Sequence, residues 1–218
     1  MYSFKKTESY RDAMLGDVRL REDSNGDWHE VGEKPRLTIK AEKGSIIATG
    51  RNENEIARIL RFNPKTGKLD SFHITDPKSK IDVEVSISDE EGWMREFREQ
   101  IKKGEKEPEY DKCKMEKTSW GWAFDDGKRK IRIGIDEGEN EVWVIGSRIS
   151  SSGERVDTKI FNLQNELLSF DSATENGAPG KVNVKKEEDE MGKFLYLTTV
   201  KLREKALEQN EFKTRGMT

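Results

Sequence analysis

The residues with the clearest chemical potential are aromatic and basic side chains concentrated between residues 118 and 161. Trp120, Trp122 and Phe124 occupy every second position, so an extended strand would place all three rings on one face of a sheet. Rings on a sheet stack on bases while nearby Lys and Arg neutralise phosphates, a combination that binds single-stranded nucleic acid. The residues predicted to form such a surface are Trp120, Trp122, Phe124, Lys128, Lys130, Arg132, Trp143 and Arg148.

The same pattern also has a structural explanation, in which the alternating rings belong to the core. Three large rings on one face form a natural buried cluster, and the lysines would then be the solvated reverse of the sheet. This explanation is favoured for any single ring, whereas strand binding is retained as the hypothesis for the sheet as a whole.

Two functions follow from these explanations. The preferred one is a non-catalytic single-stranded DNA- or RNA-binding protein, of the kind used in viral replication or recombination. The alternative is a viral or bacterial interaction or assembly protein, structural or inhibitory, that pairs with a protein partner or with further copies of itself and binds no nucleic acid.

Catalytic and metal-binding patterns are weak in this sequence. His29 and His73 are its two histidines, and they form no paired ligand motif. Cys113 lies between two lysines, a setting that lowers a thiol pKa, but no base accompanies it. We therefore predict no enzymatic activity, no metal and no cofactor. The least favoured alternative is an enzyme that uses Asp125 and Asp126 with a divalent ion.

Composition limits the class of protein. The chain has 218 residues, of which 32% are hydrophobic and 38% charged, enough for one large core or two small ones beneath a solvated surface. A formal net charge of -3 argues against a general polyanion binder but permits a local basic face. The single cysteine fits a reducing cytoplasm. No signal peptide and no run of eighteen apolar residues are present, so we expect a soluble, cytoplasmic protein with no membrane contact.

A sheet must position these side chains, and alternating hydrophobicity predicts more than one. We expect an irregular N-terminal arm at residues 1–36, a β-rich subdomain closed by a helix at 37–104, a polar linker at 105–117 and a second β-rich subdomain with a C-terminal helix at 118–218. The predicted fold class is α+β, mostly antiparallel sheet with a few covering helices. Two small sheet subdomains and a partly closed barrel of the oligonucleotide-binding type are both compatible with it.

One helix is predicted after the strand at residues 81–87. Ser88 followed by Glu91 matches a capping box, and Trp93, Phe97 and Ile101 recur at helical spacing. The apolar stripe is suited to covering a sheet.

The C-terminal half is less regular. We expect a short helix at residues 163–170, strands at 181–186 and 193–200 around an acidic turn, and a solvated helix from residue 201. Both halves combine hairpins, a further strand and a helix, with the turn at residues 63–67 corresponding to that at 136–140, but no residue-level repeat is visible.

Overall fold

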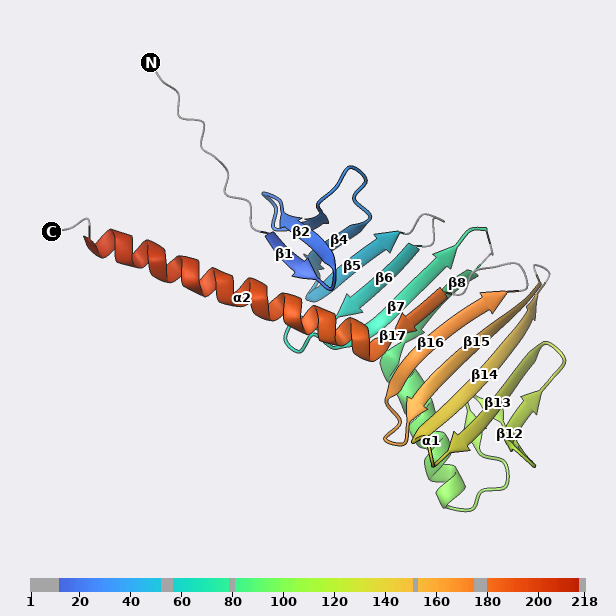
Figure 1. Ribbon diagram of the computed structural model, residues 1–218. Coiled ribbons are helices and arrows are strands. Elements are labelled where there is room, and N and C mark those ends of the chain that lie inside the picture. The colour runs from blue at the N-terminus through green and yellow to red at the C-terminus, as the bar shows by residue number, and fades with distance from the viewer. Residues whose placement is uncertain (1–11, 52–56, 79–80, 151–152, 175–179, 216–218) are drawn as a thin grey trace.

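The computed structural model describes residues 12–51, 57–78, 81–150, 153–174 and 180–215, with side chains described up to residue 199 except at residue 150. Its strands form two antiparallel meanders and one separate short hairpin, and each meander is followed directly by a helix (Figure 1). The predicted α+β class with mostly antiparallel sheet is therefore confirmed. Both sheets are open in the described part of the chain, so the barrel alternative is not observed.

The first half contains an eight-stranded sheet and one helix. Its elements are β1 (Asp12–Leu15), β2 (Val18–Glu22), β3 (Trp28–Glu30), β4 (Leu37–Glu42), β5 (Ser45–Arg51), β6 (Ala57–Phe62), β7 (Leu69–Asp76), β8 (Ile81–Ser86) and α1 (Ile87–Lys102).

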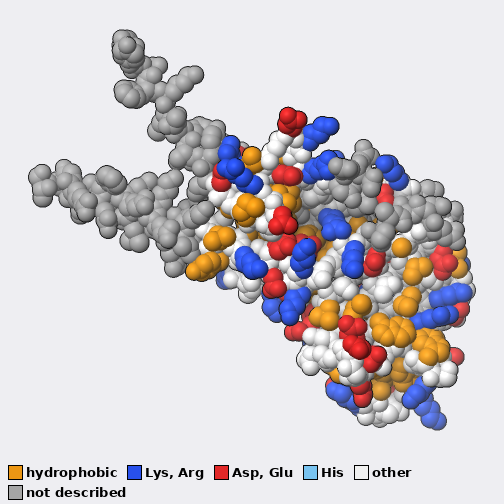
Figure 2. All heavy atoms as spheres, in the orientation of Figure 1, with side chains coloured by type: hydrophobic (Ala, Val, Ile, Leu, Met, Phe, Trp, Pro, Cys, Tyr) orange, Lys and Arg blue, Asp and Glu red, His pale blue; other side chains and the backbone are white. Residues whose placement is uncertain are grey.

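The second half contains a short hairpin, a seven-stranded sheet and a long helix. Its elements are β9 (Glu109–Tyr110), β10 (Cys113–Lys114), β11 (Glu116–Thr118), β12 (Gly121–Asp125), β13 (Arg129–Asp136), β14 (Glu141–Ser150), β15 (Gly153–Asn162), β16 (Leu167–Thr174), β17 (Gly180–Asn183) and α2 (Val184–Arg215). Acidic and basic side chains are interspersed over the face shown in Figure 2, as the charged composition predicts.

Two segments expected to be irregular contain strands. The expected N-terminal arm includes β1, β2 and β3, where Leu20 is fully buried. The expected linker includes the hairpin β9–β10, where Tyr110 and Met115 are buried. These strands are too short to show a clear period of two, and they are held by packing: β1 contacts α2 and β9 contacts α1. The division into two β-rich subdomains at residues 37–104 and 118–218 stays a prediction.

The C-terminal elements also differ from those expected. Residues 163–170 form a turn and the start of β16, not a helix. The predicted strand at residues 193–200 lies within α2, which begins immediately after β17. Asn183 caps that helix, because its Oδ1 accepts a hydrogen bond from the backbone N–H of Lys186 at 3.0 Å.

The two sheets carry matching rows of side chains on their inner faces. Cross-strand pairing links Trp28, Ile39, Ala48, Leu60, Phe72 and Val85 from β3 to β8. It links Trp122, Ile133, Val144, Lys159, Phe170 and Val182 in the same order from β12 to β17. Each sheet also has a register shift in the pairing before its last one. The shift lies beside Phe62 where β6 pairs with β7, and beside Phe161 where β15 pairs with β16. The halves are thus two copies of one architecture.

This register corrects the expected turn correspondence. The turn at residues 63–67 matches that at 162–166, because both connect the strands on either side of the register shift. In each turn an asparagine Oδ1, from Asn63 or Asn162, accepts backbone N–H groups from the next few residues. The turn at 136–140 instead corresponds to the β4–β5 turn.

Each helix follows one sheet and packs on the other. The ring of Phe97 in α1 meets that of Trp122 edge-on at 5.8 Å, and the ring of Phe194 in α2 meets that of Trp28 edge-on at 5.2 Å. The carboxylate of Glu91 accepts the backbone N–H of Leu167 at 3.1 Å. The carboxylate of Glu188 in α2 accepts the backbone N–H of Leu69 at 3.0 Å. Ser86, not Ser88, is the N-cap of α1, which leaves Glu91 free for this contact.

Because of this exchange, the two halves share one continuous core. The last strands of the two sheets also meet, with β8 against β16 and β17 against β7. The rings of Phe72 and Phe170, which occupy equivalent positions in the two rows, lie 5.2 Å apart across that junction.

The exchange predicts that either helix stabilises the whole chain. Phe97→Ala and Phe194→Ala should each lower the free energy of unfolding by about 3 to 5 kcal/mol, because each removes a buried ring from the opposite sheet. Urea unfolding followed by far-UV circular dichroism measures the change.

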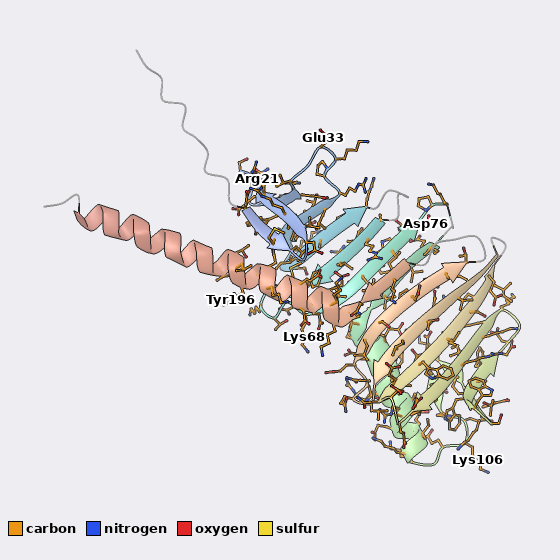
Figure 3. The ribbon with its side chains drawn as sticks, in the orientation of Figure 1. Arg21, Glu33, Lys68, Asp76, Lys106 and Tyr196 are labelled. Atoms are coloured by element: carbon orange, nitrogen blue, oxygen red, sulfur yellow. The ribbon has the colours of Figure 1, made fainter. Side chains whose placement is uncertain are left out.

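The control is Tyr196→Ala, because Tyr196 projects from α2 with 67% of its surface exposed (Figure 3). We expect an effect within about 0.5 kcal/mol. Equal effects of Phe194→Ala and Tyr196→Ala would contradict the packing of α2 on the first sheet.

Candidate nucleic-acid interface

Two of the predicted stacking residues face inward. Trp122 is 8% exposed and packs on Phe97, and its cross-strand partner is the buried Ile133. Phe124 is partly buried against the same core. The core explanation therefore holds for these two rings. They are corrected from binding residues to packing residues, because period-two alternation places them under helix α1.

Two predicted tryptophans lie on the opposite, outer face of the second sheet. Trp120 belongs to the turn before β12, where its backbone leaves the strand alternation, and it is 43% exposed. Its ring is parallel to that of Trp143 on β14, with centroids 6.3 Å apart and an interplanar angle of 9°. The guanidinium of Arg132 lies over the Trp120 ring, 5.6 Å from its centroid. The structure thus brings together three of the predicted residues.

Gly134 lets Trp143 lie against the sheet. A Cβ built on Gly134 would come within 2.2 Å of the Trp143 ring, so only glycine fits beneath it. The equivalent positions in the first sheet hold Lys40 opposite Ile47. The first sheet therefore forms without a tryptophan over a glycine at the equivalent pair of positions.

A shallow depression of about 270 Å³ continues this surface along the sheet. Lys130 and Arg132 supply its positive charge, Ile145 and Val156 supply apolar surface, and Glu154 adds one carboxylate. The Lys130 ammonium lies 3.5 Å from Asp125, whereas Arg132 has no ion-pair partner among the described residues. We call the group Trp120, Lys130, Arg132, Trp143 and Ile145 the outer patch; hydrophobic side chains gather over β12–β14 in Figure 2.

The remaining two predicted residues lie elsewhere. Lys128 is exposed in the β12–β13 turn, where Asp126 Oδ1 accepts its backbone N–H at 2.9 Å. Arg148 is exposed but belongs to the inner face, because it pairs in register with Arg129 and Arg155. The single predicted surface is therefore divided between the two sides of the sheet.

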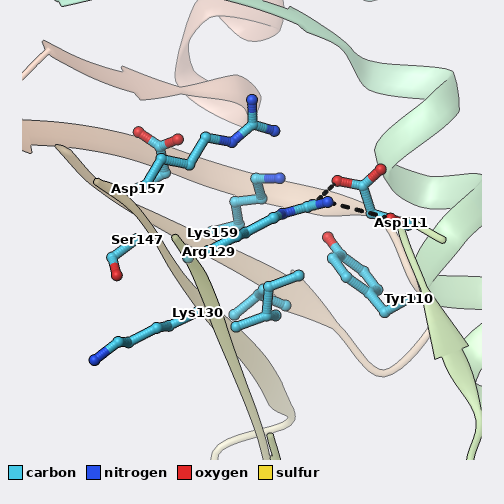
Figure 4. Close-up of a pocket in the computed structure, with 11 residues that line it drawn as sticks. Tyr110, Asp111, Arg129, Lys130, Ser147, Asp157 and Lys159 are labelled. Carbon is cyan, nitrogen blue, oxygen red and sulfur yellow. Dashed lines mark hydrogen bonds and ion pairs between the residues drawn. The ribbon is translucent and has the colours of Figure 1, made fainter. Parts of the chain in front are cut away.

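The inner face of the same sheet has a polar end that the sequence did not reveal. Arg129 forms an ion pair with Asp111 in the β9–β10 turn, and Figure 4 shows both groups beside Tyr110 and Lys159. Glu90 of α1 is 5% exposed; it accepts the Tyr110 hydroxyl at 3.0 Å and lies 2.6 Å from the Lys159 ammonium. Burial, and then the Glu90 carboxylate, raise the pKa of Tyr110 well above 10.0.

The other candidate catalytic groups have structural roles. Burial raises the pKa of the Cys113 thiol despite the guanidinium of Arg129 beside it, so the neighbouring lysines do not activate this thiol. Asp126 accepts the backbone N–H groups of Lys128 and Arg129, which lower its pKa and close the β12–β13 turn. It is a turn residue in this structure.

A cluster of possible metal ligands around His29 was not predicted, because no ligand motif in the sequence marks it. In the described part of the chain, ligand atoms of Asp23, Asp27 and His29 lie within 4.8 Å of one another in and beside the β2–β3 turn. Asp23 Oδ1 accepts the backbone N–H groups of Asn25 and Asp27, and its Oδ2 lies 3.1 Å from His29 Nε2. These contacts suffice to explain the cluster as a turn.

Comparison with known proteins identifies no relative. No protein-family model, no curated protein and no solved structure matches this chain. Among the described residues, neither helix combines the length and apolar character needed to cross a membrane.

The two tryptophans of the predicted stripe should respond differently to truncation. Trp122→Ala should lower the free energy of unfolding by about 3 to 5 kcal/mol because it empties a core position. Trp120→Ala should cost about 0.5 to 1.5 kcal/mol, the range for one surface aromatic contact. Urea unfolding of the two variants measures both changes, and a larger loss for Trp120→Ala would reverse the assignment of the faces.

The buried phenol predicts a pH effect. Because its pKa is raised, neutral Tyr110 stabilises the fold below pH 10, and this contribution is lost as the pH rises above that value. Tyr110→Phe should lower stability at pH 7 by about 1.5 to 3 kcal/mol, through the lost hydrogen bond to a charged group, and should flatten the decline above about pH 10.

Thermal unfolding between pH 7 and 11 tests this, with Tyr196→Phe as the exposed control. Other groups ionise in the same way in all three proteins, so only the difference between the variants is informative. An unchanged alkaline decline in Tyr110→Phe would show that the phenol does not control it.

Proposed function

We propose that this protein is a non-catalytic single-stranded nucleic-acid-binding protein and that the outer patch is its binding surface. The observation that supports this most is the parallel pair of the exposed Trp120 and the half-buried Trp143, with the guanidinium of Arg132, which has no described ion-pair partner, over the Trp120 ring. Exposed rings beside cations are what sequence-tolerant strand binding needs. A cytoplasmic location, in which the free, buried Cys113 stays reduced, belongs to the same proposal.

Comparison of the two sheets supports a dedicated surface. At the positions of Arg132, Gly134 and Trp143 the first sheet has Thr38, Lys40 and Ile47. One copy of the architecture therefore lacks the aromatic pair while keeping the inner row of packing residues. Exposed tryptophan is costly to leave in water, so its retention on one sheet favours a binding role.

The test is a titration of intrinsic tryptophan fluorescence with poly(dT) at low and at moderate salt. We expect salt-dependent quenching. Trp120→Ala should weaken binding by about 1 to 3 kcal/mol, the value of one stacked base, or roughly 5- to 150-fold. Arg132→Gln should weaken binding and reduce the slope of log affinity against log salt by about 0.7, the value for one phosphate contact with a single strand.

Arg61→Gln is the matched control, because Arg61 is an exposed arginine on a strand of the first sheet. It should change neither affinity nor slope. A flat titration of the wild-type protein at low salt, or equal losses for Arg61→Gln and Arg132→Gln, would refute the outer patch as a strand-binding surface.

The second candidate is an interaction or assembly protein. Apolar side chains that remain exposed favour it, namely Ile145, Ile149, Tyr196 and Leu197. A flat fluorescence titration together with a concentration-dependent increase in mass by light scattering would favour this function over the first.

A further inference from the structure

We propose that the polar cavity between β8, α1 and the inner face of β14–β16 binds a phosphate group, with Arg148 and Arg155 as its principal ligands. This site lies on the inner face of the second sheet, opposite the outer patch. It does not depend on the proposed function.

A row of three arginines crosses the sheet at this place. Register pairing puts Arg129 on β13 opposite Arg148 on β14, and Arg148 opposite Arg155 on β15. Like charges directly opposite one another on neighbouring strands are destabilising unless anions compensate them. The row therefore indicates where anions should be found.

The protein compensates only the two outer arginines. Arg129 pairs with Asp111, and Arg155 pairs with Asp157 at 2.9 Å while also donating to the backbone carbonyl of Asp82 at 3.3 Å. The side chain of Arg148, in the middle, makes no hydrogen bond or ion pair with any described residue. The Nε of Arg155 is buried and donates to no described residue. Buried donors of this kind are normally satisfied, so the row can accommodate a further acceptor.

Arg148 and Arg155 border a cavity of about 290 Å³ in which most of the other charged groups contact a partner. Glu90 is neutralised by Lys159 at 2.6 Å, and the second carboxylate oxygen of Asp157 accepts the Ser172 hydroxyl at 2.6 Å. Asp82 is paired with His73 at 2.5 Å and its side chain is 78% exposed. Glu84 is also exposed, on the solvent side of β8. Among the described residues of this lining, Arg148 is the cation without an ion-pair partner, and Glu84 is the carboxylate without one.

The first sheet shows that the fold does not need these charges. Leu60 stands at the position of Lys159, and Ile74 at that of Ser172. Gly50 occupies the position of Gly146, and at both glycines the nearest atoms to an added Cβ lie at ordinary contact distance, 3.8 and 4.0 Å. In the second sheet, Lys159 and Ser172 therefore place polar groups where the first sheet has apolar packing.

Phosphate is the ligand class that these donors favour. A guanidinium presents parallel N–H donors that match the oxygens of phosphate, and two neighbouring arginines with one free cation suit a compact oxyanion. The group could come from inorganic phosphate or from the terminal phosphate of a nucleic-acid strand. The two sources share this chemistry and are separated by experiment.

The test compares thermal unfolding of the full chain in inorganic phosphate and in chloride at equal ionic strength and pH. Phosphate should raise the melting temperature in a saturable way, as a ligand of the folded state does. Calorimetric titration should show that Arg148→Gln weakens phosphate binding at least tenfold. Arg95→Gln, an exposed arginine on α1, is the control and should bind as the wild type does.

A second variant tests the other proposed ligand. Arg155→Lys keeps a cation that can pair with Asp157 but removes the Nε donor and the parallel N–H groups of the guanidinium. It should fold and weaken phosphate binding. Undiminished binding in both Arg155→Lys and Arg148→Gln, or equal melting temperatures in phosphate and chloride, would overturn the site.

Oligothymidine with a 5′-phosphate or a 5′-hydroxyl distinguishes the source. Tighter binding of the phosphorylated strand that disappears in Arg148→Gln would identify a strand terminus as the source. Equal binding of both strands, with inorganic phosphate still bound, would identify a free phosphate compound. Failure of both strands to bind would contradict the proposed function and leave the phosphate result intact.

Discussion

The exchange of helices between the two sheets is the contact on which the rest of this structure depends. Phe97 and Phe194 each complete the core of the sheet that does not precede them, and Glu91 and Glu188 each fix the first residue of a strand in the other half. Neither sheet could hide its inner row with its own residues alone. A chain with 38% charged residues can thus assemble one continuous core from two modest ones.

The repeated architecture also allows equivalent positions of the two sheets to be compared within a single molecule. Where both copies have the same kind of residue, as at Trp28 and Trp122 or at Phe72 and Phe170, the position serves packing. Where the residues differ in kind, the fold does not require the residue found in either sheet. Trp143 for Ile47 on the outer face and Lys159 for Leu60 on the inner face are such changes, and both lie in the second sheet.

Local patterns were sufficient to predict the fold class, the strand and helix around residue 87, and the aromatic and basic character of the second sheet. These patterns gave wrong predictions where tertiary contacts determine the secondary structure or the face on which a side chain lies. Residues 193–200 contain large apolar and β-branched side chains that suit a strand, but Phe194 packs on Trp28 as part of a helix, and Thr198 donates to the carbonyl of Phe194 within it. Trp120 and Trp122 were predicted to share a face because the turn that ends at Trp120 could not be located. The arginine row depends on register between strands, which no single strand encodes.

The helix exchange also determines the order in which the protein can be completed on the ribosome. Trp28 is made early, but its partner Phe194 lies 166 residues later in the chain. Until α2 emerges, the inner face of the first sheet lacks that cover, and the nascent N-terminal half exposes apolar surface for most of synthesis. The second sheet has no such delay, because α1 precedes it and is ready to receive it. Translation therefore produces a chain whose first half is finished last.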